Sequence, residues 1–229
     1  MPPSPSYWQN VALKAVIGTP REDIVYAVFT EFLTAHKNPQ ERFVIYPQLS
    51  LKWKPDDPQD KRSEIPDVGI GNFTLPSTTP PFMLRFGVEA KRAVQSMHLL
   101  PSPQSLLGNR EVLVAFHRLF FQAKNQAKAA IKNHYPINGN TVDWILLVGP
   151  YWRVCTFGPF SEAELTVRGH KQTESADFVE TLEEQARINT RPLALSDLFL
   201  LSTTESHDHL QALLAATDAA ATALNNQLM

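Results

Sequence analysis

The chain has 229 residues, of which 43% are hydrophobic, and its formal net charge at pH 7 is −2. This length allows one sizeable hydrophobic core, and the near-zero charge gives no overall signal for nucleic-acid binding. Cys155 is the single cysteine, which excludes an intrachain disulfide and fits a reducing environment. The N-terminus lacks the basic and apolar regions of a secretory signal, and no apolar run approaches the ~20 residues needed to span a bilayer. We therefore expect an intracellular protein, nuclear or cytoplasmic, without a membrane partner.

The first predicted element after a proline-rich N-terminal extension (residues 1–20) is a helix over Pro20–Ala35. Thr19 can cap this helix, and Glu22 and Asp23 suit the positive end of its dipole. Its apolar positions recur at helical spacing and predict one buried face: Ile24, Val25, Val28 and Phe32.

Three segments rich in β-branched and aromatic residues follow this helix and predict strands: Arg42–Trp53, Ile65–Leu75 and Phe82–Val94. The third segment is apolar enough to be central in a sheet. Polar or proline-rich stretches predict loops at residues 54–64, 76–81 and 99–109.

The clearest helix in the sequence extends over Glu111–Pro136, and Pro136 ends it. Its apolar positions keep a helical period: Phe116, Phe120, Ala123, Ala127 and Ile131. We then expect strands over Val142–Gly149 and Tyr151–Phe160, followed by helices over Ser175–Arg187 and Ser206–Met229.

The predicted order of elements is α-β-β-β-α-β, followed by an extra strand and a helical tail. This order is not a run of regular βαβ units, which argues against a Rossmann-like sheet. We expect an α/β core over residues 21–160, with a mixed sheet flanked by helices. A mainly helical C-terminal extension, residues 161–229, is expected to pack on this core.

Three charged residues in the predicted strands suggest chemistry. Asp67 lies in the second strand, and Glu89 and Lys91 lie two positions apart in the third, so their side chains should project on the same face. If the two strands are neighbours, Asp67 reaches the same place. Two carboxylates, with a backbone carbonyl such as that of Ala90, are ligands that suit Mg²⁺ or Mn²⁺. Lys91 would then orient a bound water or stabilise charge in the transition state.

A simpler interpretation is that Glu89 and Lys91 form an ion pair at the end of a strand. The surrounding pattern favours the site, because charged residues in so apolar a strand need a partner or a metal. The sequence Pro66-Asp67, followed by Glu89-Ala90-Lys91 on the next strand, resembles the PD-(D/E)XK superfamily of restriction-endonuclease-like nucleases. The resemblance extends over about residues 21–160.

This resemblance implies the restriction-endonuclease-like αβββαβ core and metal-dependent hydrolysis of phosphodiester bonds. It also implies a glutamine on the helix after the third strand, for which Gln122 and Gln126 are candidates. We prefer Gln126 because it falls at the edge of the apolar stripe. A glutamate on the first helix is implied as well, with Glu31 preferred over Glu22. Either residue of each pair could equally be an ordinary residue on a helix surface.

Basic residues concentrate in the middle of the chain despite the acidic total. Residues 85–134 contain eight Lys or Arg and two acidic residues, whereas residues 162–229 contain eleven acidic and four basic residues. A local basic field can attract phosphates, although such side chains can also simply solvate a helix. The candidate contacts with DNA or RNA are Arg92, Arg118, Lys124, Lys128 and Lys132.

Three functions therefore remain open from the sequence: a metal-dependent nuclease, a non-catalytic nucleic-acid-binding domain, and a protein-interaction module. For the third, the Ala- and Leu-rich helix Ser206–Met229 would be the contact surface. Its apolar stripe requires a cover, either the rest of this chain or a second copy in a homodimer.

Overall fold

A computed structural model describes residues 7, 13–17, 21–36, 43–54, 57, 59, 61–73, 82–94, 110–167 and 198–227. Its centre is a mixed sheet of six strands with the order β1-β4-β5-β6-β7-β8. Only β5 and β6 pair in parallel; every other neighbouring pair is antiparallel. The strands are β1 (Val44–Pro47), β4 (Val68–Phe73), β5 (Phe82–Lys91), β6 (Val142–Val148), β7 (Tyr151–Phe157) and β8 (Phe199–Leu200).

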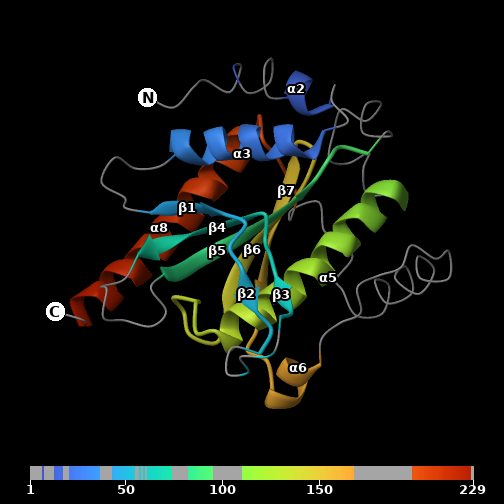
Figure 1. Cartoon of the computed structure of the whole chain (residues 1–229). Coiled ribbons are helices and arrows are strands. Elements are labelled where there is room, and N and C mark those ends of the chain that lie inside the picture. Colours follow the sequence, from blue (N-terminus) through green and yellow to red (C-terminus); the bar gives the residue numbers. More distant parts are fainter. Residues whose placement is uncertain are drawn as a thin grey trace.

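Helices cover both faces of this sheet (Figure 1). One face packs against α5 (Arg110–Lys132), and the other packs against α3 (Glu22–His36) and α8 (Thr204–Gln227). Two shorter helices complete the described part: α2 (Leu13–Ile17), which contributes the buried Val16 to the α3 side, and α6 (Glu162–Thr166). The predicted mixed α/β class, with a mixed sheet flanked by helices, is confirmed. None of the described helices is both long and apolar enough to cross a membrane.

An irregularity in β5 decides which of its side chains face α5. The register with β4 shifts between Ile70, which pairs with Phe86, and Gly71, which pairs with Leu84, so that Arg85 is the extra residue of β5. Before this bulge Phe82 and Leu84 belong to the core under α5. After it, alternate residues belong to the core under α3, namely Phe86, Val88 and Ala90. Because an extra residue reverses the alternation of side chains, Glu89 is directed toward α5.

The predicted strand Arg42–Trp53 is in fact two strands in different sheets. Gln48 has a positive φ of 51°, and its amide donates to the Asp67 carbonyl at 3.0 Å. This turn separates β1 from β2 (Leu51–Lys52), which pairs with β3 (Ser63–Glu64) in a small separate hairpin. The turn brings the apolar side chains of Leu49, Leu51 and Trp53 into the core under α5. Part of the predicted loop 54–64 is therefore a strand.

The C-terminal region contains more than the predicted helices. β8 adds a strand to the sheet next to β7, and α8 buries Leu210 and Leu214 in the core under α3. α6 begins at a capping box in which Ser161 and Glu164 bond to each other's backbone amides. This Ser-x-x-Glu pattern is a sequence signal for a helix start, so α6 could have been predicted from the sequence. The predicted helix 175–187 and the predicted loop 99–109 lie outside the described residues.

Candidate active site

Asp67 and Glu89 face each other across two neighbouring antiparallel strands. Asp67 immediately precedes β4, and Val68 pairs with Val88 of β5. The Asp67 carboxylate accepts a hydrogen bond from the Ala90 amide at 2.9 Å, and the Asp67 amide donates to Glu89 Oε2 at 3.3 Å. These reciprocal bonds hold the two carboxylates in one place, as expected if the strands are neighbours.

Helix α5 holds the Glu89 carboxylate from the other side. Gln126 Nε2 donates to Glu89 Oε2 at 2.7 Å and also lies 3.2 Å from the Ile65 carbonyl. Gln122, one turn earlier, donates to Glu89 Oε1. The two glutamines are four residues apart and so lie on the same side of the helix. Both candidate glutamines therefore contact Glu89, whose side chain is 0% exposed.

The N-terminal turn of α3 contributes a glutamate and a tyrosine. Lys91 Nζ lies 3.0 Å from Glu22 Oε1, and the Tyr26 hydroxyl donates to the same oxygen at 2.9 Å. Burial raises the pKa of the Tyr26 hydroxyl, and the nearby Asp67 and Glu22 carboxylates raise it further. The Lys91 ammonium is near enough to Glu89 for its charge to lower the pKa of that carboxyl, but its hydrogen bond is with Glu22 of α3, at the end of the strand. Tyr26 was missed, although its position one turn after Glu22 could have indicated it.

Glu31, the preferred glutamate of the first helix, does not lie in this cluster. It is nine residues after Glu22, which at about 100° per residue places it on the opposite side of the helix. The Glu31 side chain is exposed, and its carboxylate accepts a hydrogen bond from the Tyr7 hydroxyl at 2.8 Å. Glu22, the alternative candidate, is the glutamate that the fold brings to the site.

Burial raises the pKa of Glu89, and the neighbouring Asp67 carboxylate raises it further. Burial also raises the pKa of Asp67, although the Ala90 amide, Tyr26 and Lys91 act in the opposite direction. Both shifts have the same physical meaning: two negative charges lie close together, away from water, with too little positive charge beside them. Such a pair is stabilised either by retaining a proton or by binding a cation.

The donor set of this cluster suits a hard divalent cation. Carboxylate oxygens are the ligands that Mg²⁺ prefers, and Mg²⁺ often uses only one or two of them and completes its shell with water or phosphate oxygens. Among the described residues, no group of three or more His, Cys, Asp or Glu side chains has the arrangement of a metal site. The two carboxylates of Asp67 and Glu89 would leave the other coordination positions of such an ion to water or phosphate.

The basic side chains of α5 only partly match the predicted phosphate-binding surface. Lys128 is buried; its ammonium donates to the Val167 carbonyl at 3.1 Å and lies 5.5 Å from the centre of the Phe160 ring. The Lys132 ammonium lies 4.4 Å over the Trp53 ring. The Lys128 ammonium thus bonds to the residue that follows α6, and its contact with a nucleic acid stays a prediction.

The remaining basic candidates differ in their position relative to the carboxylates. Lys124 lies about 160° around α5 from Gln122 and therefore points away from Glu89. Arg118 is one turn before Gln122 and lies on the same side of the helix. Arg92 directly follows β5 and is exposed. Among the predicted nucleic-acid contacts, Arg92 thus follows Lys91 directly and Arg118 lies on the side of α5 that carries Gln122.

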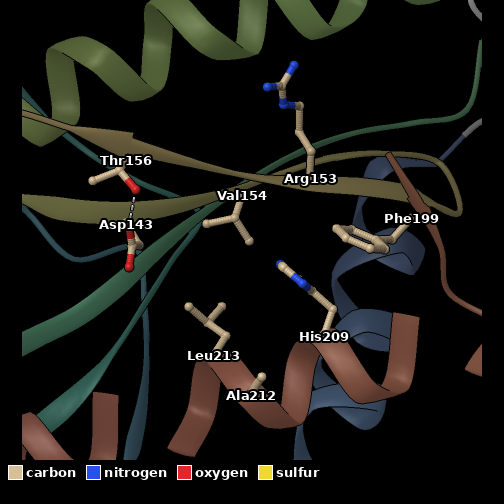
Figure 2. Close-up of a pocket in the computed structure, with 8 residues that line it drawn as sticks. All are labelled: Asp143, Arg153, Val154, Thr156, Phe199, His209, Ala212 and Leu213. Carbon is tan, nitrogen blue, oxygen red and sulfur yellow. Dashed lines mark hydrogen bonds between the residues drawn. The ribbon is translucent and has the colours of Figure 1, made fainter. Parts of the chain in front are cut away.

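A pocket of about 430 Å³ lies between β7 and α8, away from this cluster (Figure 2). Figure 2 shows Val154, His209 and Leu213 directed toward one another, whereas Arg153 extends from the other face of the strand. The imidazole of His209 stacks on Phe199, with ring centroids 4.2 Å apart. Because Glu89 faces α5 and this pocket faces α8, the pocket plays no part in the chemistry of the carboxylates.

No protein-family model, curated protein or solved structure matches the chain. The functional interpretation therefore depends on the geometry of Asp67, Glu89 and the residues around them.

Proposed function

We propose that the protein is a metal-dependent nuclease that hydrolyses phosphodiester bonds in DNA or RNA. One observation supports this function above the others: the buried Glu89 and the half-buried Asp67 adjoin each other at the end of two central strands, with raised pKa values and a lysine nearby. Their resemblance to the PD-(D/E)XK pattern, noted from the sequence, points to the same class of reaction.

In this proposal Asp67 and Glu89 bind Mg²⁺ or Mn²⁺, and the Ala90 carbonyl is the additional ligand predicted from the sequence. A bound ion would polarise the phosphoryl oxygen and lower the pKa of a coordinated water. The protein's own contribution is to fix the ligands before the ion arrives. The Ala90 amide orients Asp67, and Gln122 and Gln126 orient both oxygens of Glu89.

Lys91 is the residue we assign to the attacking water or to the charge that develops on the phosphate. Its side chain is 35% exposed, so its ammonium can exchange its contact with Glu22 for one with a substrate. Arg92 and Arg118 are the proposed contacts with the flanking phosphates, because of their positions beside Lys91 and on the Gln122 side of α5.

The test is incubation of the purified protein with plasmid DNA, single-stranded DNA and RNA, in Mg²⁺, Mn²⁺ or EDTA. Cleavage should require the metal and disappear in Asp67→Asn. Lys91→Ala should fold and bind Mn²⁺ and nucleic acid, yet cleave about 100-fold more slowly, the scale of one lost acid–base or electrostatic contribution. A fully active Lys91→Ala variant would place the chemistry elsewhere in the chain.

The contact between Lys91 and Glu22 favours a second candidate, a nucleic-acid-binding or protein-interaction domain without catalysis. In that case Lys91 serves to neutralise Glu22 and the buried carboxylates, and has no role toward a water molecule. Lys91→Ala would then lower the free energy of unfolding without any cleavage to lose. Absence of nuclease activity in the wild-type protein, with every substrate and both metals, would leave this candidate alone.

A further inference from the structure

Three aromatic rings form a strip at the β1 edge of the sheet, where β1 pairs with β4 (Figure 1). The strip consists of Tyr46 on β1, Phe82 on β5 and Phe73 on β4. The buried Phe82 ring contacts both others, with centroids 5.6 Å from Tyr46 and 5.9 Å from Phe73. Gly71 leaves room for this ring, because a Cβ atom at Gly71 would lie 2.7 Å from Phe82 Cζ. The two outer rings therefore rest on a fixed inner one.

The outer rings of the aromatic strip are open to solvent. Tyr46 is 40% exposed and Phe73 is 61% exposed, and no other Phe, Tyr or Trp side chain in the described part of the chain is exposed. Since a whole aromatic side chain has about 150–250 Å² of surface, the two together expose roughly the area of one such side chain. A stable protein interface buries about 800 Å² on each partner. The strip is therefore too small to hold a second protein chain and fits small planar groups.

The aromatic strip lies on the same side of the sheet as Glu89 and begins beside Asp67. Its buried ring belongs to the core under α5, the helix toward which Glu89 is directed. Tyr46 pairs with Gly69, and Phe73 ends β4. At about 3.3 Å per residue, these two positions are roughly 7 Å and 20 Å along β4 from Asp67. A chain of planar groups that followed the strip would therefore lead to the carboxylates.

We propose that the aromatic strip stacks unpaired nucleobases, so that the substrate of the carboxylate site is single-stranded nucleic acid. This inference rests on the proposed function, because it names the substrate of Asp67 and Glu89. Aromatic side chains stack on bases with little regard to sequence, because every base has a π-face. Bases of a single strand can be splayed out onto such rings, whereas those of a duplex stay stacked on each other. The strip thus selects for strandedness.

The direct test is fluorescence anisotropy of the full chain with labelled single-stranded DNA and RNA, duplex DNA, and an abasic single strand of equal length, all in EDTA. Phe73→Ala should bind the single strands about 5- to 150-fold more weakly, the scale of one lost base stack. Phe73→Tyr keeps the ring and should match wild type. Val167→Ala, which trims an exposed apolar side chain after α6, should also match it. The abasic strand should bind wild type and Phe73→Ala equally, because it offers phosphates without bases.

The outcomes separate this inference from the nuclease assignment. Equal affinity of wild type and Phe73→Ala for the single strands would overturn the inference and leave metal-dependent cleavage standing. An equal loss of affinity for the abasic strand would overturn it as well, and so would a change of mass in light scattering, which would identify a second copy as the occupant.

The kinetics in Mn²⁺ provide the second readout. KM of Phe73→Ala for single-stranded DNA should rise by the factor lost in affinity, while kcat stays within about twofold, because stacking away from the reacting bond contributes to binding. Binding of single strands through Phe73 without any Mn²⁺-dependent cleavage would overturn the nuclease assignment and leave the stacking surface in place.

Discussion

Replacement of Glu89 by glutamine tests the buried carboxylate most directly. Three donors point at Glu89: the side-chain amides of Gln122 and Gln126, and the backbone amide of Asp67. In Glu89→Gln the new oxygen can keep the two donors that bond to Oε2. The new NH₂ group takes the place of Oε1, and Gln122 can turn over its amide to accept from it. The fold should therefore tolerate Glu89→Gln.

Glu89→Ala should behave differently, because it removes the acceptor for all three donors. Gln122 is half-buried and can turn toward water, but Gln126 Nε2 and the Asp67 amide then lose their Glu89 partner. At about 1–3 kcal/mol for each buried donor that loses its partner, we expect a loss of roughly 2–6 kcal/mol in the free energy of unfolding. The retained bond of Gln126 with the Ile65 carbonyl places the expected value toward the lower end.

The pH dependence of stability distinguishes wild type from Glu89→Gln in the absence of metal. Burial raises the pKa of Glu89, so the folded protein keeps a proton that the unfolded chain releases above about pH 4.3. The contribution of Glu89 to wild-type stability is complete below that pH and falls as the pH rises toward the folded-state pKa, by about 1.4 kcal/mol for each unit of pH. Glu89→Gln has no proton to release there, so its stability should lack this contribution to the fall.

Urea unfolding between pH 5 and 8 in EDTA measures this difference, with Glu162→Gln on the exposed helix α6 as control. Adding Mn²⁺ at 100 times its dissociation constant should stabilise wild type by about 2.7 kcal/mol. For a chain of this length, that is roughly 5–11 °C in melting temperature. Glu89→Gln should gain none of it. Parallel pH profiles for wild type and Glu89→Gln would contradict the raised pKa of Glu89. Equal stabilisation of both proteins by Mn²⁺ would show that Glu89 is not a metal ligand.

Three further predictions concern the packing of the sheet and of α8. A Cβ atom at Gly87 would lie 2.3 Å from the Trp144 ring, so Gly87→Ala should lower the free energy of unfolding in urea by about 1–3 kcal/mol; an unchanged midpoint would contradict this packing. Burial and the neighbouring His36, whose ring centroid lies 4.3 Å away, lower the pKa of His207. The contribution of His207 to stability should therefore fall as the pH drops from about 6.5 through the lower folded-state pKa, and His207→Phe should remove that contribution. Leu210 of α8 is 0% exposed, so Leu210→Ala should cost about 2–5 kcal/mol by thermal or urea unfolding, and a loss below 1 kcal/mol would mean that α8 is weakly docked.

The sequence by itself determined the parts of the structure that follow from local periodicity. The apolar run around Phe86–Ala90 predicted a central strand, and the helical spacing around Phe116–Ile131 predicted α5. Because β4 and β5 are separated by only one loop, their pairing was a natural expectation, and with it the approach of Asp67 to Glu89. These features depend on residues that are close in the chain or on a two-residue alternation.

Only the tertiary structure decided which members of equivalent pairs belong to the site. Glu22 and Glu31 both flank the apolar face of α3, so the helical pattern does not distinguish them. Which glutamate reaches the site depends on which end of α3 packs beside Asp67 and Lys91. Likewise, the burial of Lys128 depends on the Val167 carbonyl, 39 residues later in the chain.

The bulge at Arg85 is the clearest example of a feature that depends on tertiary contacts. Alternation alone predicts that Leu84 and Glu89 face opposite sides of the sheet, yet the extra residue places both on the side of α5. The bulge is stabilised by contacts that no local pattern contains: Arg85 bonds to Asn72 of β4 at 2.6 Å and to Asp218 of α8 at 2.7 Å. The partner on α8 is 133 residues away in sequence. A local pattern therefore predicts that a strand forms, whereas the side of the sheet that its charged residues face depends on partners brought together by the complete fold.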